Sequence, residues 1–75
     1  MNKEEILKYL KENPGWVLQK HSSLKGKGWW WLRHGSGSPS TIKLDGRSAR
    51  AASAELEIKQ KDKFGRVDYA LPVNS

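Results

Sequence analysis

The sequence predicts one small α+β domain with an N-terminal helix, a central helix and an antiparallel sheet that ends in a C-terminal β-hairpin. Three observations support this fold class. Apolar residues recur at helical spacing near the N-terminus, a second breaker-free segment is rich in alanine, and apolar and charged residues alternate in the last third of the chain. A length of 75 residues is enough for a single hydrophobic core. We therefore expect one domain over residues 1–75.

The first predicted element is an amphipathic helix over residues 2–12. Its apolar residues form one stripe, and Asn2 is a suitable N-cap residue. Pro14 and Gly15 end the helix, because proline cannot continue the hydrogen-bond ladder and glycine accepts a positive φ. The short apolar run over residues 16–19 fits either a strand or the first turn of a helix.

The middle of the chain divides into four short segments, with glycines marking most of their boundaries. Residues 20–28 are polar and rich in glycine, which predicts a loop. Residues 29–33 are mostly aromatic and lie between glycines, which predicts a strand. Residues 34–40 form a flexible connection, and residues 41–44 alternate in the manner of a brief extended segment.

A second helix is predicted over residues 46–55. Asp45 is a good N-cap residue, and the alanine-rich sequence after it contains no helix breaker. Arg47 and Arg50 lie on one face by their spacing, whereas small residues occupy the opposite face. We expect the small residues to pack closely and the two arginines to project together.

The last predicted element is a β-hairpin over residues 57–71. Apolar and charged residues alternate on both sides of residues 62–65, and Gly65 suits the tight position of the turn. Pro72 stops the strand pairing.

The segment LDGRSARAASAELE, followed by the charged hairpin IKQKDKFGRVDYALP, resembles the winged-helix family of DNA-binding domains, best over residues 44–71. The resemblance implies a winged-helix-like domain in which residues 46–56 are the recognition helix and residues 57–71 are the wing. Family members set that helix in the major groove and touch the adjacent backbone with the wing. The residues that match recognition-helix positions or the wing tip are Arg47, Ser48, Arg50, Lys61, Lys63 and Arg66.

The net charge of +6 is concentrated in the middle of the chain. Residues 1–19 and 51–75 are each neutral, whereas residues 20–50 hold seven basic residues and one acidic residue. A basic segment that also contains aromatic rings suits a polyanion, because cations displace counterions from phosphates and rings stack on bases. The alternative is that the charge only keeps the protein in solution.

Three consecutive tryptophans are the most unusual feature of the sequence. On a strand, Trp29 and Trp31 share one face, while Trp30 shares the other with Leu32. One face can fill the core, and the other is left as a stacking or docking surface or is covered by a loop.

The sequence carries no enzyme or metal-site pattern. It contains no cysteine, which excludes disulfides and thiolate metal sites, and His21 and His34 have no clustered acidic partners for zinc. The glycine-rich segments match neither a Walker A loop nor a dinucleotide fingerprint. We expect no catalysis, no cofactor and no metal. Charged residues interleave with apolar ones at the N-terminus, so we expect a soluble cytoplasmic domain with no signal peptide and no membrane contact.

These patterns predict a non-enzymatic nucleic-acid-binding domain with a regulatory role. Its expected partner is double-stranded DNA rather than RNA, bound through phosphates, with arginines 47 and 50 reaching base edges. The footprint is small, so specific binding calls for a homodimer or larger assembly. The predicted contact residues are Arg47, Arg50, Ser48, Lys43, Lys25, Lys27, Arg33, Lys61, Lys63, Arg66, Trp30 and His34.

Two alternatives stay open at this point. One is a small protein-interaction or inhibitory module of the mobile-element type, which uses the strand Trp29–Trp31 as a hydrophobic anchor. The other is binding of RNA or a single strand through stacked tryptophans.

Overall fold

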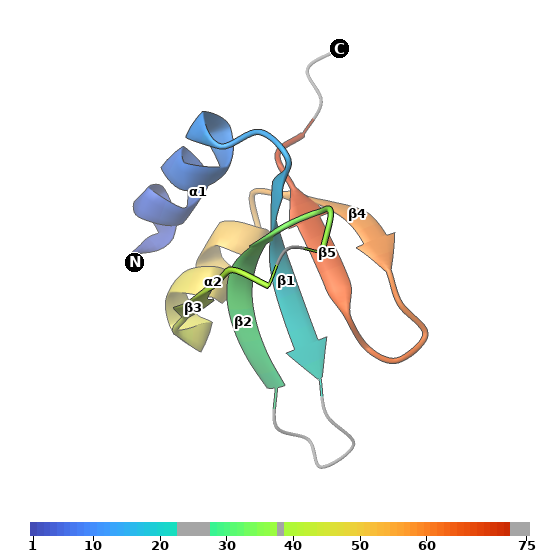
Figure 1. Cartoon of the computed structure of the whole chain (residues 1–75). Helices are drawn as coiled ribbons and strands as arrows, with labels where there is room; N and C mark the ends of the chain where they lie inside the picture. Colours follow the sequence, from blue (N-terminus) through green and yellow to red (C-terminus); the bar gives the residue numbers. More distant parts are fainter. Residues whose placement is uncertain (23–27, 38, 73–75) are drawn as a thin grey trace.

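The computed structural model describes residues 1–22, 28–37 and 39–72 and shows helices packed on one face of an antiparallel sheet (Figure 1). The elements in chain order are α1 (Lys3–Glu12), β1 (Trp16–Ser22), β2 (Gly28–His34), β3 (Thr41–Leu44), α2 (Gly46–Ser53), β4 (Glu57–Lys61) and β5 (Val67–Ala70). The strand order in the five-stranded sheet is β3-β2-β1-β5-β4. The predicted α+β class is confirmed.

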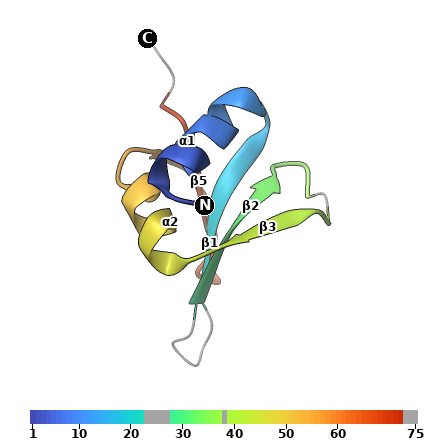
Figure 2. The same cartoon turned by 90° about the vertical axis from the view of Figure 1, so that its left-hand side faces the viewer.

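Both helices cover the same side of the sheet, and the opposite side has no helix in the described structure (Figure 2). The core between the layers contains Ile6 and Leu10 from α1, Leu18 from β1 and Leu32 from β2, all nearly or fully buried. Neither helix in the described part of the chain is long and apolar enough to cross a membrane.

Helix α1 begins and ends where local signals predict. The Asn2 side chain accepts a hydrogen bond from the Glu5 amide at 2.8 Å, and the Glu5 carboxylate accepts one from the Asn2 amide at 3.1 Å. This reciprocal capping satisfies two otherwise orphan donors. Gly15 then turns the chain into β1 with φ of +93°, and its carbonyl accepts a 2.7 Å hydrogen bond from the Gly35 amide. The turn therefore also joins β1 to the segment after β2.

The predicted loop over residues 20–28 is wrong at both ends. Strand β1 continues to Ser22 and β2 begins at Gly28, with Lys20 paired to Trp30 and His21 paired to Trp29. The polar residues of β1 become strand because the tryptophan strand supplies a hydrogen-bonding partner for them. The ambiguous run over residues 16–19 is likewise strand, and residues 23–27 lie outside the described residues.

Helix α2 confirms the predicted cap and the predicted faces. The Asp45 carboxylate accepts a 2.8 Å hydrogen bond from the Ser48 amide, which holds the pKa of Asp45 below its ordinary value. Ala49 and Ala52 are fully buried, whereas the two arginines of the helix are exposed. The helix ends at Ser53, two residues before the predicted end, because the next residues form a turn.

The C-terminal hairpin is confirmed, with β4 and β5 joined by the predicted turn. Gly65 has φ of +95°, and its amide donates to the Asp62 carbonyl at 3.2 Å. Strand β5 also pairs with β1, so the hairpin extends the main sheet. Leu71 lies just beyond the end of β5.

Trp30 belongs to the core, which corrects its prediction as a nucleic-acid contact. It is 7% exposed, and its ring centroid lies 5.9 Å from that of Tyr69. Trp30 points toward the helices because it has the same strand parity as Leu32. The opposite parity directs Trp29 and Trp31 to the side of the sheet without helices, as the alternation predicts.

Candidate nucleic-acid interface

The positive charge of the central segment is divided between the two sides of the sheet. We call the set Lys20, Arg47, Arg50 and Lys61 the basic row, which lies on the side of the helices. We call the set Gln19, His21, Trp29 and Trp31 the aromatic face, which lies on the opposite side. The division follows from strand parity, because neighbouring residues of a strand point to opposite sides of the sheet.

Strand register aligns the lysines of the basic row. Trp30 pairs with Lys20, Lys20 pairs with Val67, and Val67 pairs with Lys61, so these residues form one line across four strands. Directly paired residues of antiparallel strands point to the same side. Lys20 and Lys61 are two strands apart, which places their backbones about 10 Å from each other.

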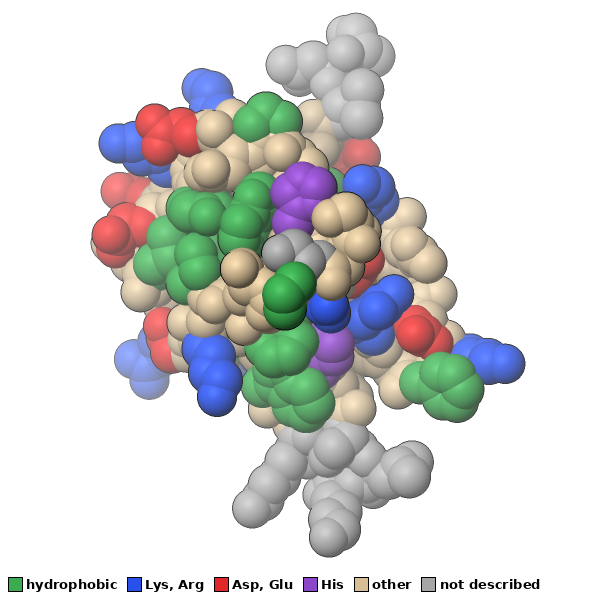
Figure 3. Space-filling view, in the orientation of Figure 1, with side chains coloured by type: hydrophobic (Ala, Val, Ile, Leu, Met, Phe, Trp, Pro, Cys, Tyr) green, Lys and Arg blue, Asp and Glu red, His purple; other side chains and the backbone are tan. Residues whose placement is uncertain are grey.

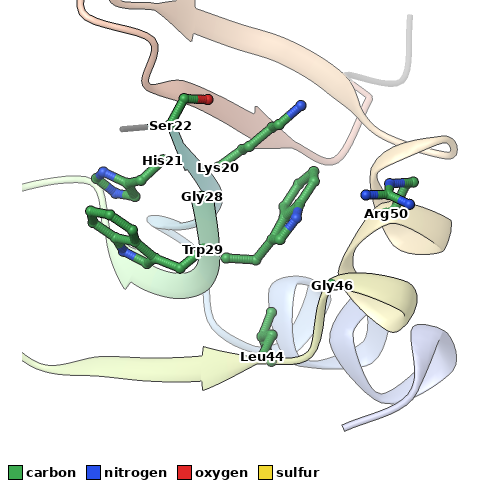
Figure 4. Close-up of a pocket in the computed structure, with 9 residues that line it drawn as sticks. Lys20, His21, Ser22, Gly28, Trp29, Leu44, Gly46 and Arg50 are labelled. Atoms are coloured by element: carbon green, nitrogen blue, oxygen red, sulfur yellow. The ribbon is translucent and has the colours of Figure 1, made fainter. Parts of the chain in front are cut away.

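The arginines of the basic row come from α2, beside the same end of the sheet. Arg50 and Lys20 both line a hollow of about 510 Å³ at the ends of β1 and β2, which also reaches His21 and Trp29 around the end of the sheet. Figure 4 shows these two side chains on one side of the β1–β2 ribbon, with His21 and Trp29 on the other side. The Lys20 ammonium lies 5.6 Å from the centroid of the Trp30 ring. Within the described residues, no basic-row cation forms an ion pair.

The aromatic face consists of three rings in mutual contact. The His21 and Trp29 rings are parallel within 1°, with centroids 4.8 Å apart. Trp31 meets both of them edge-on, with centroids 4.7 Å from His21 and 5.7 Å from Trp29. Trp29 is 44% exposed, so the cluster reaches the surface.

A buried glutamine holds two of these rings in place. The Gln19 Oε1 atom accepts a 2.7 Å hydrogen bond from Trp31 Nε1, and it lies 3.2 Å from His21 Nε2. Indole nitrogen only donates, so the glutamine atom that it contacts must be the oxygen. His21 Nε2 must then carry a proton to donate to the same oxygen. The aromatic face is therefore positioned by Gln19 before any ligand arrives.

Basic side chains surround the aromatic face. Lys43 pairs with Trp31 in register, and Arg33 donates from Nη2 to the Gly37 carbonyl at 2.8 Å. Arg66 Nε lies 3.6 Å from Asp68 Oδ1, which is buried and has no hydrogen-bond partner among the described residues. In Figure 3, hydrophobic side chains and a histidine lie together near the lower middle of the molecule, with Lys and Arg side chains next to them.

The environment of His21 favours its neutral form. Burial is the largest cause that lowers the pKa of His21, and the charges of Arg66 and Arg33 lower it further, against the opposite effect of Asp68. The ring is thus a flat, uncharged neighbour of Trp29 at neutral pH.

We expect the protein to lose stability as the pH falls below the ordinary histidine pKa of about 6.5. The folded-state pKa of His21 is lowered, so the unfolded chain binds more protons in this interval and stability rises with pH. Thermal unfolding between about pH 5.5 and 7.5 measures the effect, and His21→Gln flattens the dependence. His34→Gln is the control that keeps His21 in place. An unchanged pH dependence in His21→Gln would contradict the assignment.

The structure distributes the predicted contact residues over several places. Arg47, Arg50 and Lys61 are exposed in the basic row, and Lys63 lies at the hairpin turn, with its ammonium 5.3 Å from the centroid of the Phe64 ring. Arg33, Lys43 and Arg66 surround the aromatic face. Lys25 and Lys27 lie outside the described residues.

Two predicted contact residues have structural partners instead. His34 Nδ1 accepts a 3.1 Å hydrogen bond from the Ser36 amide, and its ring meets that of Trp16 edge-on at the far end of β2. His34 thus lies at the opposite end of β2 from Trp29, away from the aromatic face, and its contact with a nucleic acid stays a prediction. Ser48 is half-buried and takes part in the cap of α2 through its amide.

Sequence reasoning missed Gln19, Lys20 and His21 because it placed two of them in a loop. A usable signal was present. Residues 20–22 and 28–30 lie on either side of one short polar segment, which is the spacing of a hairpin. Pairing the two segments in that way places His21 beside Trp29 and Lys20 beside Trp30.

The described part of the chain contains no group of three or more His, Cys, Asp or Glu residues that could hold a metal ion. Comparisons of the chain with known protein families, with curated proteins and with solved structures find no match.

Proposed function

We propose that the protein binds double-stranded DNA without catalysis, through the basic row. The observation that carries the proposal is that four exposed cations from β1, α2 and β4 lie on one side of the sheet with no ion pair among the described residues. Cations that are not neutralised within the protein gain most by displacing counterions from DNA phosphates.

Helix α2 supplies the part of this surface that suits base recognition. Its two arginines project on the side opposite the buried alanines, and an arginine fork bonds guanine bidentately in the major groove. In the proposal, α2 takes the recognition-helix position of the winged-helix family, and the hairpin of β4 and β5 takes the wing position. Lys61 and Lys63 then contact the adjacent backbone.

The salt dependence of duplex binding tests the proposal. With roughly 4–6 phosphates contacted, the slope of log affinity against log salt concentration is expected to be about −4 to −5. Fluorescence anisotropy of a labelled duplex, titrated at several salt concentrations, measures this slope. A duplex affinity that does not change with salt would rule out phosphate binding by the basic row.

A further inference from the structure

We infer that the aromatic face is a second binding site, for unpaired bases of single-stranded DNA. Its rings lie on the opposite side of the sheet from the basic row, although His21 and Trp29 also reach the hollow that Lys20 and Arg50 line. The duplex proposal assigns no role to these rings. The inference rests on the proposed function only for the choice of DNA over RNA. Its other grounds are ring geometry, surface exposure and the charges around the rings.

Trp29 offers an open stacking surface. His21 stacks on one face of its ring at a parallel centroid distance of 4.8 Å, Trp31 meets the ring edge-on, and the residue as a whole is 44% exposed. The other face of the ring is the one left for a ligand. Every nucleobase has a flat face that stacks on such a ring, so the contact does not depend on base identity. A base placed there would continue the stack that His21 and Trp29 already form.

A hollow beside the rings provides space for the base and its backbone. It measures about 350 Å³ and is lined by Trp29, Trp31 and Lys43 from the aromatic side and by Trp30 and Leu44 from the helix side, so it lies at the edge of β2 where β3 ends. This volume is at the lower end of the range for small-ligand sites. Lys43 at the hollow supplies a cation for the phosphate that follows the stacked base.

The rings of the aromatic face are held in place before a ligand binds, which favours affinity. Gln19 is 4% exposed, and its oxygen fixes Trp31 by a 2.7 Å hydrogen bond and holds His21 at 3.2 Å. Rings that are already ordered lose little conformational entropy on binding. Among the described residues paired with Gln19 across the sheet, the acidic one is Asp68 of β5. The guanidinium of Arg66 lies beside its carboxylate. Its charge is therefore partly offset, and Lys43, which pairs with Trp31, is left as an exposed cation beside the rings.

The test is a titration of the full chain with an oligothymidine of about 8 nucleotides, followed by tryptophan fluorescence. Stacking on Trp29 is expected to quench the fluorescence. Trp29→Ala is expected to weaken binding about 5- to 150-fold and to remove most of the quenching. Trp29→Phe keeps an aromatic ring and is expected to retain most of the affinity, whereas Trp29→Leu is expected to behave like Trp29→Ala.

The matched control is Phe64→Ala, which removes a 78% exposed aromatic ring from the hairpin turn. It is expected to leave oligothymidine affinity unchanged. Circular dichroism of each variant establishes that it is folded. Three outcomes would overturn the inference: no quenching of the folded wild-type protein, equal affinities of Trp29→Ala and wild type, and full affinity in Trp29→Leu, which would indicate a general hydrophobic anchor for a protein.

Two further experiments distinguish single-strand binding by the aromatic face from duplex binding by the basic row. Arg47→Glu/Arg50→Glu is expected to weaken duplex binding and leave oligothymidine quenching in place, whereas Trp29→Ala is expected to do the reverse. Loss of duplex binding in both variants would reject the aromatic face as a separate site. The second experiment repeats the titration with oligouridine, an RNA. Binding of oligouridine without binding of oligothymidine would reject DNA as the ligand.

Discussion

Replacing Leu18 by alanine is expected to lower the free energy of unfolding by about 2–5 kcal/mol. Leu18 is fully buried on the central strand, and it pairs with Leu32 of β2 and Tyr69 of β5. The substitution removes apolar contacts and leaves a cavity where the surrounding strands are held in register. Small domains have a total stability of about 5–15 kcal/mol, so the variant is expected to be close to unfolding. Chemical denaturation measures the change.

The matched control for this prediction is Ile58→Ala. Ile58 is a large apolar residue on the edge strand β4 and is 56% exposed, so its loss is expected to cost less than about 1 kcal/mol. Equal destabilisation by the two substitutions would contradict the position of the core.

Reversing both arginines of α2 in Arg47→Glu/Arg50→Glu is expected to reduce duplex affinity on the order of 100-fold. Each arginine is exposed, and the loss of two charge-assisted contacts to base edges accounts for about 3 kcal/mol. Because these arginines are proposed to contact base edges rather than phosphates, the slope of log affinity against log salt is expected to stay close to that of the wild type. A carboxylate at position 47 is in the first turn of the helix, where it is favourable, whereas one at position 50 is in the last turn, where it is unfavourable. Circular dichroism of the variant therefore establishes that it is folded. Anisotropy with a labelled duplex measures both quantities.

The control for this variant is Lys11→Glu/Lys59→Glu, which changes the net charge by the same amount. These two lysines lie together beside Gly15 and Trp16, at the other end of β1 from Lys20. If binding depends on the basic row, the control retains most of the duplex affinity. Similar losses in both variants would show that net charge alone governs binding.

The helices and the hairpin were predictable because their signals are local. Asn2 and Asp45 cap helices through hydrogen bonds to residues three positions later. Gly65 sets the hairpin turn within four residues. Such contacts join residues that are close in the sequence and do not depend on the tertiary fold, so the residues that make them can be identified from the sequence.

Strand β1 and the candidate site were only partly predictable because they depend on pairing. Lys20 and His21 have no strand signal of their own and are extended because they pair with Trp30 and Trp29. The alternation along β2 correctly separates Trp30 from the other two tryptophans, but it does not say which side meets the helices. The helix packing decides that, and it turns Trp30 into a core residue.

The sequence by itself determined that the chain carries its charge excess and its tryptophans in one segment, because composition and order do not depend on folding. Only the tertiary structure decided that this segment has two sides with different chemistry. A strand directs alternate side chains to opposite faces, and the helices cover just one of them. Cations of adjacent strands, such as Lys20 of β1 and Arg33 of β2, therefore lie on different surfaces, while Lys20 and Arg50, thirty positions apart, line the same hollow.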